Sequence, residues 1–313
     1  MTTSVPHVLT LFGYDWDALA AAERAGRVRL SHAGFDLFSF PQNARLLWFD
    51  IQAWVDRLAR RYAGQLDGVV SHNEQFGALA AALLAERLSL PGNDPAAILR
   101  CQHKLAMREL LEEVAPEANL PFFLLPCEYG DPAPEGLTYP LFIKPIKAAY
   151  SVLARRVESR EALAELIRFG RFETWIIRRL VKPFDDVARE RVGFTVDANH
   201  MIAEQPFRAD QFNLDGWFHD GRMHVLGVVD SLMYPGTQAF LRFAYPSRLP
   251  PAVQARAADV AERFLRAAGF RHGFFNMEFF HDATTGELKV IEFNPRMAAQ
   301  FSDLYLRVDG VDL

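Results

Sequence analysis

Short apolar runs alternate with helical patterns from residue 8 to about residue 90. The runs at 8–12, 28–35 and 66–72 have the length and composition of strands, and the stretches after them place apolar residues at helical spacing. Strands that alternate with helices are typical of a parallel sheet. We therefore expect the front of the chain to form a small, doubly wound, Rossmann-like α/β domain.

A turn-rich segment, Pro91 to Pro95, interrupts this pattern and predicts a domain boundary near residue 93. The chain then divides into residues 1–93 and a second part, 94–313, in which α and β elements are mixed. The last residues, 308–313, predict a loop that enters another element, so we expect the supplied chain to stop before the domain does. The expected helices of the second part cover 96–114, 159–170 and 250–270, and its expected strands cover 139–146, 151–157, 173–181, 199–207, 273–280 and 287–295, with a hairpin through His219, Asp220 and Gly221.

The composition narrows the classes of function. Lys plus Arg (34) against Asp plus Glu (39) leaves a net charge of -5, so no basic surplus is available for binding nucleic acid. Charges interrupt the apolar segments well before the roughly 20 residues of a membrane-spanning helix, and no basic start precedes the first apolar stretch. We expect a cytoplasmic protein without a membrane partner. Cys101 and Cys127 lack the spacing of a zinc site and are expected to be buried thiols.

The last two expected strands carry an unusual arrangement of acidic residues. Side chains alternate in a strand, so Asn276 and Glu278 share one face of the first strand, and Glu292 and Asn294 share one face of the second. Positions 278 and 292 are symmetric about the hairpin loop, so an antiparallel pairing sets the two carboxylates opposite each other. Facing like charges are destabilising unless something neutralises them.

A hard divalent cation is the natural neutraliser of this pair. Magnesium takes carboxylate and amide oxygens and completes its shell with water and substrate phosphates, so Glu278, Glu292 and Asn294 are the expected metal ligands and a nucleotide is the expected partner. Arg296 is expected to direct its guanidinium toward phosphate or carboxylate. A solvated hairpin with two exposed acids is the alternative.

The common nucleotide-binding motifs are missing from the chain. No GxGxxG follows the first strand and no GxxxxGK[ST] occurs, so neither the dinucleotide fingerprint nor the P-loop is available. His72, Asn73 and Glu74 stand at the carboxyl end of the third expected strand, where open α/β sheets place ligands. Alternatively, Asn73 caps the following helix.

Two segments, NMEFF (276–280) and VIEFNPR (290–296), resemble the ATP-grasp superfamily, whose carboxylate–amine ligases carry an acidic strand and then a Glu-x-Asn-Pro-Arg-like motif. The resemblance covers roughly residues 95–305. It implies an ATP-grasp fold of two α+β subdomains behind the Rossmann-like domain, with ATP and Mg²⁺ as cofactors.

The resemblance also implies which residues hold the nucleotide phosphates. Lys104 on a helix and Lys144 on a strand match the two lysines of the family. Members commonly have a glycine-rich loop over the phosphates, whereas residues 145–152 read PIKAAYSV and contain no glycine. Lys147 and Ser151 are the residues expected to compensate.

For the base, the resemblance implies a contact within AEQPF (203–207). Glu204 or Gln205 is expected to reach the exocyclic amine, and Phe207 to supply a main-chain donor and apolar cover. Gln211 falls where the family commonly has a Glu near the ribose. The alternative for this stretch is an ordinary edge strand.

Polar residues in an apolar, aromatic stretch mark an expected substrate region. These are Asp230, Tyr234 and Arg242, and Arg242 is expected to pair a substrate carboxylate or the migrating phosphate. An Asp at a strand end and a Tyr before Pro-Gly are also ordinary turn residues, which is the alternative.

The implied reaction activates a small carboxylate, with an amino acid as the first expectation, as an acyl phosphate and couples it to an amine. Lys144, Arg242 and Arg296 are the expected catalytic residues, because phosphoryl transfer needs positioning and charge neutralisation. Two alternatives stay open: a bicarbonate-activating carboxylase subunit of the same fold, and an ATP-binding protein without turnover, which the glycine-free loop favours. Many relatives are dimers, so a homodimer is one expectation.

Overall fold

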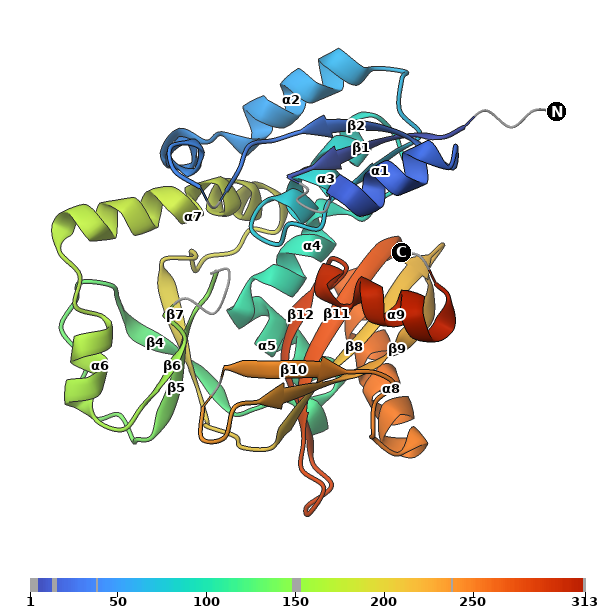
Figure 1. Cartoon of the computed structure of the whole chain (residues 1–313). Helices are drawn as coiled ribbons and strands as arrows, with labels where there is room; N and C mark the ends of the chain where they lie inside the picture. The colour runs from blue at the N-terminus through green and yellow to red at the C-terminus, as the bar shows by residue number, and fades with distance from the viewer. Residues whose placement is uncertain (1–4, 13–15, 38, 148–152, 238, 312–313) are drawn as a thin grey trace.

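The computed structural model describes residues 5–12, 16–37, 39–147, 153–237 and 239–311. Within these ranges the strands form a parallel three-stranded sheet, an antiparallel four-stranded sheet and an antiparallel five-stranded sheet (Figure 1). The fold therefore combines α-helices and β-strands, which is the mixed architecture that the sequence predicts. None of the described helices is both long and apolar enough to cross a bilayer.

The front of the chain builds the parallel sheet. Its strands are ordered β2-β1-β3, and β1 pairs in parallel with both neighbours. Leu9 and Leu11 of the central strand are fully buried. The elements are β1 (His7–Leu11), α1 (Trp16–Arg24), β2 (Arg29–Ala33), the 3-10 helix η1 (Gln42–Trp48), α2 (Ile51–Tyr62), β3 (Gly68–Val70) and α3 (Gly77–Arg87).

The helix expected over 96–114 is two helices, α4 (Pro95–Gln102) and α5 (Lys104–Val114), separated at His103. The buried His103 ring caps α5, because its Nδ1 accepts from the Ala106 N–H at 3.2 Å while Nε2 lies 3.0 Å from the Val196 carbonyl. Burial lowers the pKa of His103 to about 4, which keeps the ring neutral and able to accept. Lys104 therefore starts a new helix, and its N–H donates to the Ile146 carbonyl just after β5.

The four-stranded sheet has a core of its own. Its order is β4-β7-β5-β6, so β7 pairs on both edges, and the edge-strand alternative for 203–207 is wrong for Ala203 and Glu204, which lie in β7. Leu125, Ile143, Leu163 and Met201 belong to this separate apolar cluster. The elements are the 3-10 helix η2 (Pro116–Ala118), β4 (Phe122–Glu128), β5 (Leu141–Pro145), β6 (Arg155–Val157), α6 (Arg160–Leu166) and β7 (His200–Glu204).

The strand expected over 173–181 is wrong. This segment lies in α7 (Arg171–Arg191), which begins with a Glu173 carboxylate that accepts from the Gly170 N–H at 2.7 Å. The buried residues of α7 are in its second half, from Pro183 to Ala188, whereas Trp175 is exposed. The β-branched and aromatic composition of 173–181 therefore does not reflect a buried strand.

The five-stranded sheet has the order β10-β9-β8-β11-β12. Helix α8 packs beside it, with the Phe264 ring stacked on Phe293 of β12 at a centroid distance of 3.8 Å. Helix α9 extends to Asp309, so the loop expected over 308–313 is partly helical. The elements are β8 (Asp210–His219), β9 (Arg222–Met233), β10 (Phe240–Ala244), α8 (Pro251–Ala268), β11 (Gly273–His281), β12 (Leu288–Asn294), the 3-10 helix η3 (Ala299–Phe301) and α9 (Ser302–Asp309).

The largest apolar core joins the front sheet to the five-stranded sheet. It contains Leu83 of α3, Ile98 of α4 and Phe264 of α8, on both sides of the boundary expected near residue 93. The division into residues 1–93 and 94–313 stays a prediction.

Candidate active site

The predicted pairing of the two acidic strands is confirmed by the register. Glu278 of β11 lies directly opposite Glu292 of β12, and Asn276 lies opposite Asn294. A bulge follows Glu278, so the facing carboxylates stand at the last regular pair before the register shifts. Bulges often lie next to active sites, where they redirect side chains.

The two facing carboxyl groups differ in protonation. Burial, with the neighbouring Glu292 charge, raises the pKa of Glu278 to about 8. Glu278 accepts from Gln211 Nε2 at 2.9 Å and from Asn294 Nδ2 at 3.3 Å. Burial acts to raise the pKa of Glu292 as well, but Lys104 and Lys144 outweigh it and hold that pKa at about 2. One proton therefore suffices to relieve the repulsion that the sequence predicts.

Lys104 neutralises Glu292 from the start of α5. Its Nζ lies 3.2 Å from Glu292 Oε2, and both side chains are only partly accessible. Burial acts to lower the pKa of Lys104, but the Glu292 and Glu74 carboxylates raise it. The break at His103 starts α5 at this lysine and directs it to the acidic hairpin.

Lys144 belongs to a buried ionic triad. Glu204 Oε2 lies 2.9 Å from Lys144 Nζ, and its Oε1 accepts from Arg108 Nε at 2.8 Å. Burial opposes the charge on Glu204, but Arg108 and Lys144 hold its pKa below the ordinary value. Burial also lowers the pKa of Lys144. The triad joins α5 to β5 and β7 of the four-stranded sheet.

The third group of charges links the front sheet to the end of β12. Arg296 Nη2 donates to Glu74 Oε2 at 2.7 Å, and the Glu74 carbonyl accepts from Lys147 Nζ at 3.2 Å. Gln102 Nε2 also donates to this carbonyl, at 2.6 Å. Burial lowers the pKa of Lys147 to about 8. Lys147 is thus held by a main-chain oxygen without a carboxylate hydrogen bond among the described residues.

The residues of this cluster fit a divalent cation and a polyphosphate. Glu278, Glu292 and Asn294 offer two carboxylates and an amide on adjacent positions of one hairpin, which is a hard oxygen donor set. Lys104, Lys144, Lys147 and Arg296 bring four cationic groups to the same place.

A family model with the description "ATP-grasp domain" matches residues 137–303, more than half of the chain. The chain belongs to the ATP-grasp family. The matched segment contains the five-stranded sheet with the acidic hairpin and strands β5, β6 and β7 of the four-stranded sheet, whereas β4, Lys104 and Arg108 lie before it.

Two curated relatives of this ATP-grasp chain match parts of it. One is the uncharacterized protein y4rH of Sinorhizobium fredii, 28% identical over 235 residues, which are 74% of this chain and 43% of that protein. The other is the D-alanine–D-alanine ligase of Deinococcus radiodurans, 29% identical over 175 residues, with 54% of this chain and 45% of the ligase covered. The chain thus spans less than half the length of the curated relatives it matches.

Among solved structures, the ATP-grasp chain is similar to an L-amino acid ligase from Bacillus licheniformis. The TM-score is 0.73, the sequence identity is 20%, and the match covers 99% of this chain and 72% of the ligase. This likeness confirms the ATP-grasp fold that the sequence predicts.

The residues predicted to hold the base in the ATP-grasp site lie at the end of β7. Glu204 is buried in the triad, whereas Gln205 is exposed and its N–H donates to the Pro121 carbonyl at 2.9 Å. The Phe207 ring lies 5.9 Å from the Phe280 ring, which covers one side of this region. A cavity of about 670 Å³ opens beside Gln205, and its lining includes Pro121, Phe122, Tyr139, Arg156 and Pro206.

Gln211, predicted near the ribose, donates from its Nε2 to Glu278 Oε2 at 2.9 Å, and its contact with a ribose stays a prediction. Arg242 is exposed on β10, which β9 and β8 separate from the acidic hairpin, and no ion pair joins it to the cluster in the part of the chain that the structure describes. Ser151 lies outside the described residues.

Asp230 and Tyr234, the other two residues of the expected substrate region, lie in different surroundings. Asp230 accepts from the Ser247 hydroxyl and from the Arg248 N–H, so it anchors the segment after β10. Tyr234 is exposed. The turn alternative therefore fits Tyr234, whose carbonyl accepts from the Thr237 N–H at 3.1 Å, whereas Asp230 lies inside β9.

The N-cap position of α3 is Phe76 rather than Asn73, but the Asn73 side chain still binds the first N–H groups of this helix. Its Oδ1 accepts from the N–H groups of Phe76 at 3.1 Å and Gly77 at 3.2 Å. Glu74, next to it, turns into the charged cluster and pairs with Arg296. A ligand-binding role for this strand end stays a prediction.

Sequence reasoning missed a buried polar chain behind the hairpin. Asn276 Nδ2 donates to Asp215 Oδ1 at 2.8 Å, and Tyr305 donates to Asp215 Oδ2 at 2.8 Å. Burial raises the pKa of Asp215 to about 6. The signal was present, because Gln211, Asn213 and Asp215 alternate on one face of β8 beside Glu278.

Arg108 was also missed. It is fully buried and donates to Glu204, to Asn119 Oδ1 at 3.0 Å and to the Ile291 carbonyl at 3.2 Å. Its spacing offers a signal, since residues four apart share a helix face and Lys104 is four residues earlier. An arginine on that face is positioned to reach the same strands.

Proposed function

We propose that this protein is an ATP-dependent carboxylate–amine ligase that acts on an amino acid with Mg²⁺ as the metal. The observation that carries the proposal is the direct pairing of Glu278 with Glu292, next to Asn294 and among the cations Lys104, Lys144 and Arg296. Membership of the ATP-grasp family and the likeness to ligases support it.

When bound, ATP supplies the phosphoryl group that activates a carboxylate, and Mg²⁺ neutralises the phosphate charge. Glu292, held anionic by Lys104, and Asn294 would hold the metal without a change of protonation. Glu278, whose pKa is about 8, would hold the metal as the carboxylate. Lys144 and Lys104, fixed by Glu204 and Glu292, are placed to stabilise charge that develops on the phosphates.

The named relatives support the proposed substrate class. The matched D-alanine–D-alanine ligase and L-amino acid ligase both have amino acids in their names, which supports an amino acid as the substrate here. Arg242 stays a proposal for binding a carboxylate, and its exposure on β10 leaves it available to solvent. The cytoplasmic location and the homodimer also stay predictions.

The activity is tested by a screen of carboxylates, amino acids first, with ATP, Mg²⁺ and hydroxylamine, in which ADP and hydroxamate are measured together. We expect ADP and hydroxamate to appear in equal amounts for at least one amino acid. ADP that depends on bicarbonate with no hydroxamate would identify a carboxylase instead. A folded protein that binds ATP but forms no ADP with any acid contradicts the ligase proposal.

The metal ligands are tested by Glu292→Gln, which keeps the side-chain shape and removes the charge. We expect kcat/KM to fall at least about 100-fold, since even partners outside the ligand shell are worth 10–100-fold. Glu287→Gln, on the exposed loop of the same hairpin, is the matched control and should leave kcat/KM unchanged. Retained activity in Glu292→Gln would remove this carboxylate from the mechanism.

A further inference from the structure

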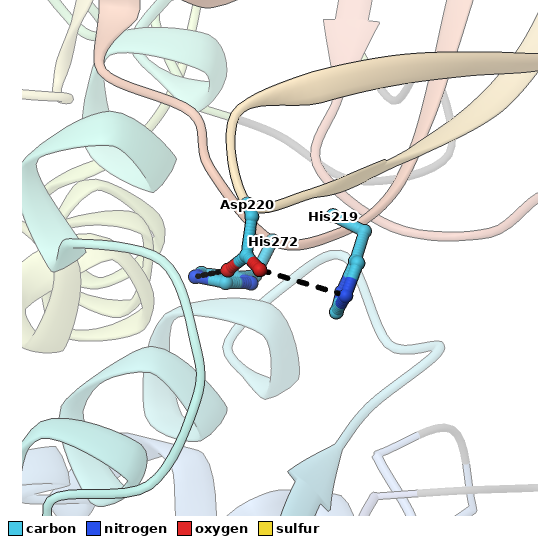
Figure 2. Close-up of side chains that lie close together, drawn as sticks. All are labelled: His219, Asp220 and His272. Carbon is cyan, nitrogen blue, oxygen red and sulfur yellow. Dashed lines mark ion pairs between the residues drawn. The ribbon is translucent and has the colours of Figure 1, made fainter.

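A second cluster of metal-binding side chains lies outside the charged site. His219 and Asp220 form the end of the β8–β9 hairpin, and His272 lies just before β11 (Figure 2). One ligand atom from each residue lies within 4.8 Å of the other two. Among the described residues, this is the group of three His, Cys, Asp or Glu side chains whose possible ligand atoms lie this close to one another.

The backbone holds these three residues together. Gly273 pairs with Phe218 in the antiparallel β8–β11 ladder, so the same register continued by one residue sets His272 opposite His219. Asp220 and Gly221 both have positive φ, 49° and 73°, as in the tight turns that join antiparallel strands. The turn brings Asp220 between the two rings, as Figure 2 shows.

The segment that carries His272 is also fixed from the other side. Asn93 Oδ1 accepts from the N–H groups of Arg271 at 2.8 Å and His272 at 3.0 Å, and Asn93 Nδ2 donates to the His272 carbonyl. The Gly221 N–H donates to the Arg271 carbonyl at 3.1 Å. The cluster is therefore built on ordered backbone, which lowers the entropy lost when a ligand binds.

The distances within the cluster suit ligands of a shared ion. Asp220 Oδ2 lies 3.7 Å from His219 Nε2, and Asp220 Oδ1 lies 3.8 Å from His272 Nε2. Both separations exceed a hydrogen bond. Ligands 2.0–2.1 Å from a tetrahedral zinc ion are separated by roughly 3.3 Å, so a small side-chain adjustment completes the geometry.

The donor set selects the class of metal. Two imidazoles and one carboxylate suit zinc and similar transition metals, whereas magnesium and calcium prefer oxygen ligands alone. We propose that His219, Asp220 and His272 bind one divalent transition metal ion of the zinc class, which ties the β8–β9 turn to the start of β11. Asp220 and His219 are largely exposed, which leaves the site open to solvent and to a water as fourth ligand.

The experiment titrates untagged protein with Zn²⁺ against a chromophoric chelator, with millimolar Mg²⁺ present to compete at the acidic hairpin. We expect one equivalent of Zn²⁺ to bind. His272→Ala and Asp220→Asn should weaken binding at least about tenfold, and Asn tolerates the left-handed backbone at 220. Zinc at about 100 times its Kd should raise Tm by roughly 3–6 °C in the wild type and not in these variants.

Two controls separate this site from others. His224→Ala removes another exposed histidine of the same hairpin, and Glu292→Gln removes a carboxylate of the charged site. Both should keep the zinc affinity. The proposal is overturned if the wild type binds no Zn²⁺ at micromolar concentration, or if the double variant His219→Ala/His272→Ala binds it as the wild type does.

Discussion

Arg108 and Glu204 are both buried, and the charge of each side chain is neutralised by the opposite charge of the other. The guanidinium donates to Glu204, Asn119 and a main-chain carbonyl at once, so each of its three nitrogens has a partner in a fixed direction. A lysine offers a point charge without this fork. The triad with Lys144 therefore depends on an arginine at position 108.

Removing Arg108 tests this dependence. We expect Arg108→Met to lower the free energy of unfolding by about 3–5 kcal/mol, because it leaves the Glu204 charge buried with one partner. Urea denaturation monitored by circular dichroism measures the change. Arg87→Ala, which removes the surface pair with Asp56, should cost less than about 1 kcal/mol. Equal losses for the two variants would argue against a special role for the triad.

Asp185 on α7 gives stability a pH dependence. Burial raises its pKa to about 6, while its Oδ1 accepts from the Ala198 N–H at 2.8 Å. The folded state holds this proton more tightly than the unfolded state, whose pKa is about 3.9. The stabilising contribution is therefore complete below pH 4 and is lost as the pH rises through 6.

We expect Asp185→Asn to remove this loss while an amide oxygen keeps the hydrogen bond. Between pH 4.5 and 7.5 the wild type should lose about 2 kcal/mol more stability than the variant. Urea titrations at both pH values give the difference. Asp186→Asn, at the exposed neighbouring position, should follow the wild type. Parallel curves for Asp185→Asn and the wild type would refute the assignment.

Much of the site is visible in the sequence at the residue scale. The facing of Glu278 and Glu292 follows from strand alternation and the symmetry of one hairpin, both of which are local properties. The partners of Glu74 and Glu204 do not follow in this way. Glu74 meets Arg296 from 222 positions away, and no local spacing reports a contact of that length.

At the element scale, strand and helix predictions succeeded where burial and periodicity agree. Segment 173–181 failed because its aromatic and β-branched residues lie on the partly exposed first half of α7. The break at His103 was missed because a histidine caps α5 only when burial keeps it neutral, which is a tertiary effect. Strand β4 was also missed because of a tertiary effect, since its partner β7 is distant in sequence.

The end of α8 provides a test at this scale. Gly269 has φ of 88° and its N–H closes the helix on the Leu265 and Arg266 carbonyls. Gly269→Ala should cost about 1 kcal/mol, because the left-handed backbone strains a Cβ while the space around it is adequate. Gly68→Ala, on β3 with ordinary φ and a contact at 3.7 Å, should change the free energy of unfolding by less than about 0.5 kcal/mol. Thermal or urea unfolding that ranks them in reverse would contradict this account.

At the scale of the whole molecule, the charged site draws on the front sheet and on both antiparallel sheets. Glu74 follows β3, Lys144 and Glu204 come from the four-stranded sheet, and Glu292 comes from the five-stranded sheet. The front sheet and the five-stranded sheet share one apolar core, which joins them firmly. The site therefore depends on the front segment as well as on the matched family region.

The four-stranded sheet is tied to the rest of the molecule by apolar and ionic contacts together. Leu125, Ile143 and Leu163 pack in a core of this sheet, whereas Ile202 of β7 belongs to the larger core. Glu204 of β7 pairs with Arg108 of α5, and Lys144 Nζ lies 3.5 Å from the Ile291 carbonyl of β12. The packing of this sheet against α5 and β12 therefore sets the distance from Lys144 to the acidic hairpin.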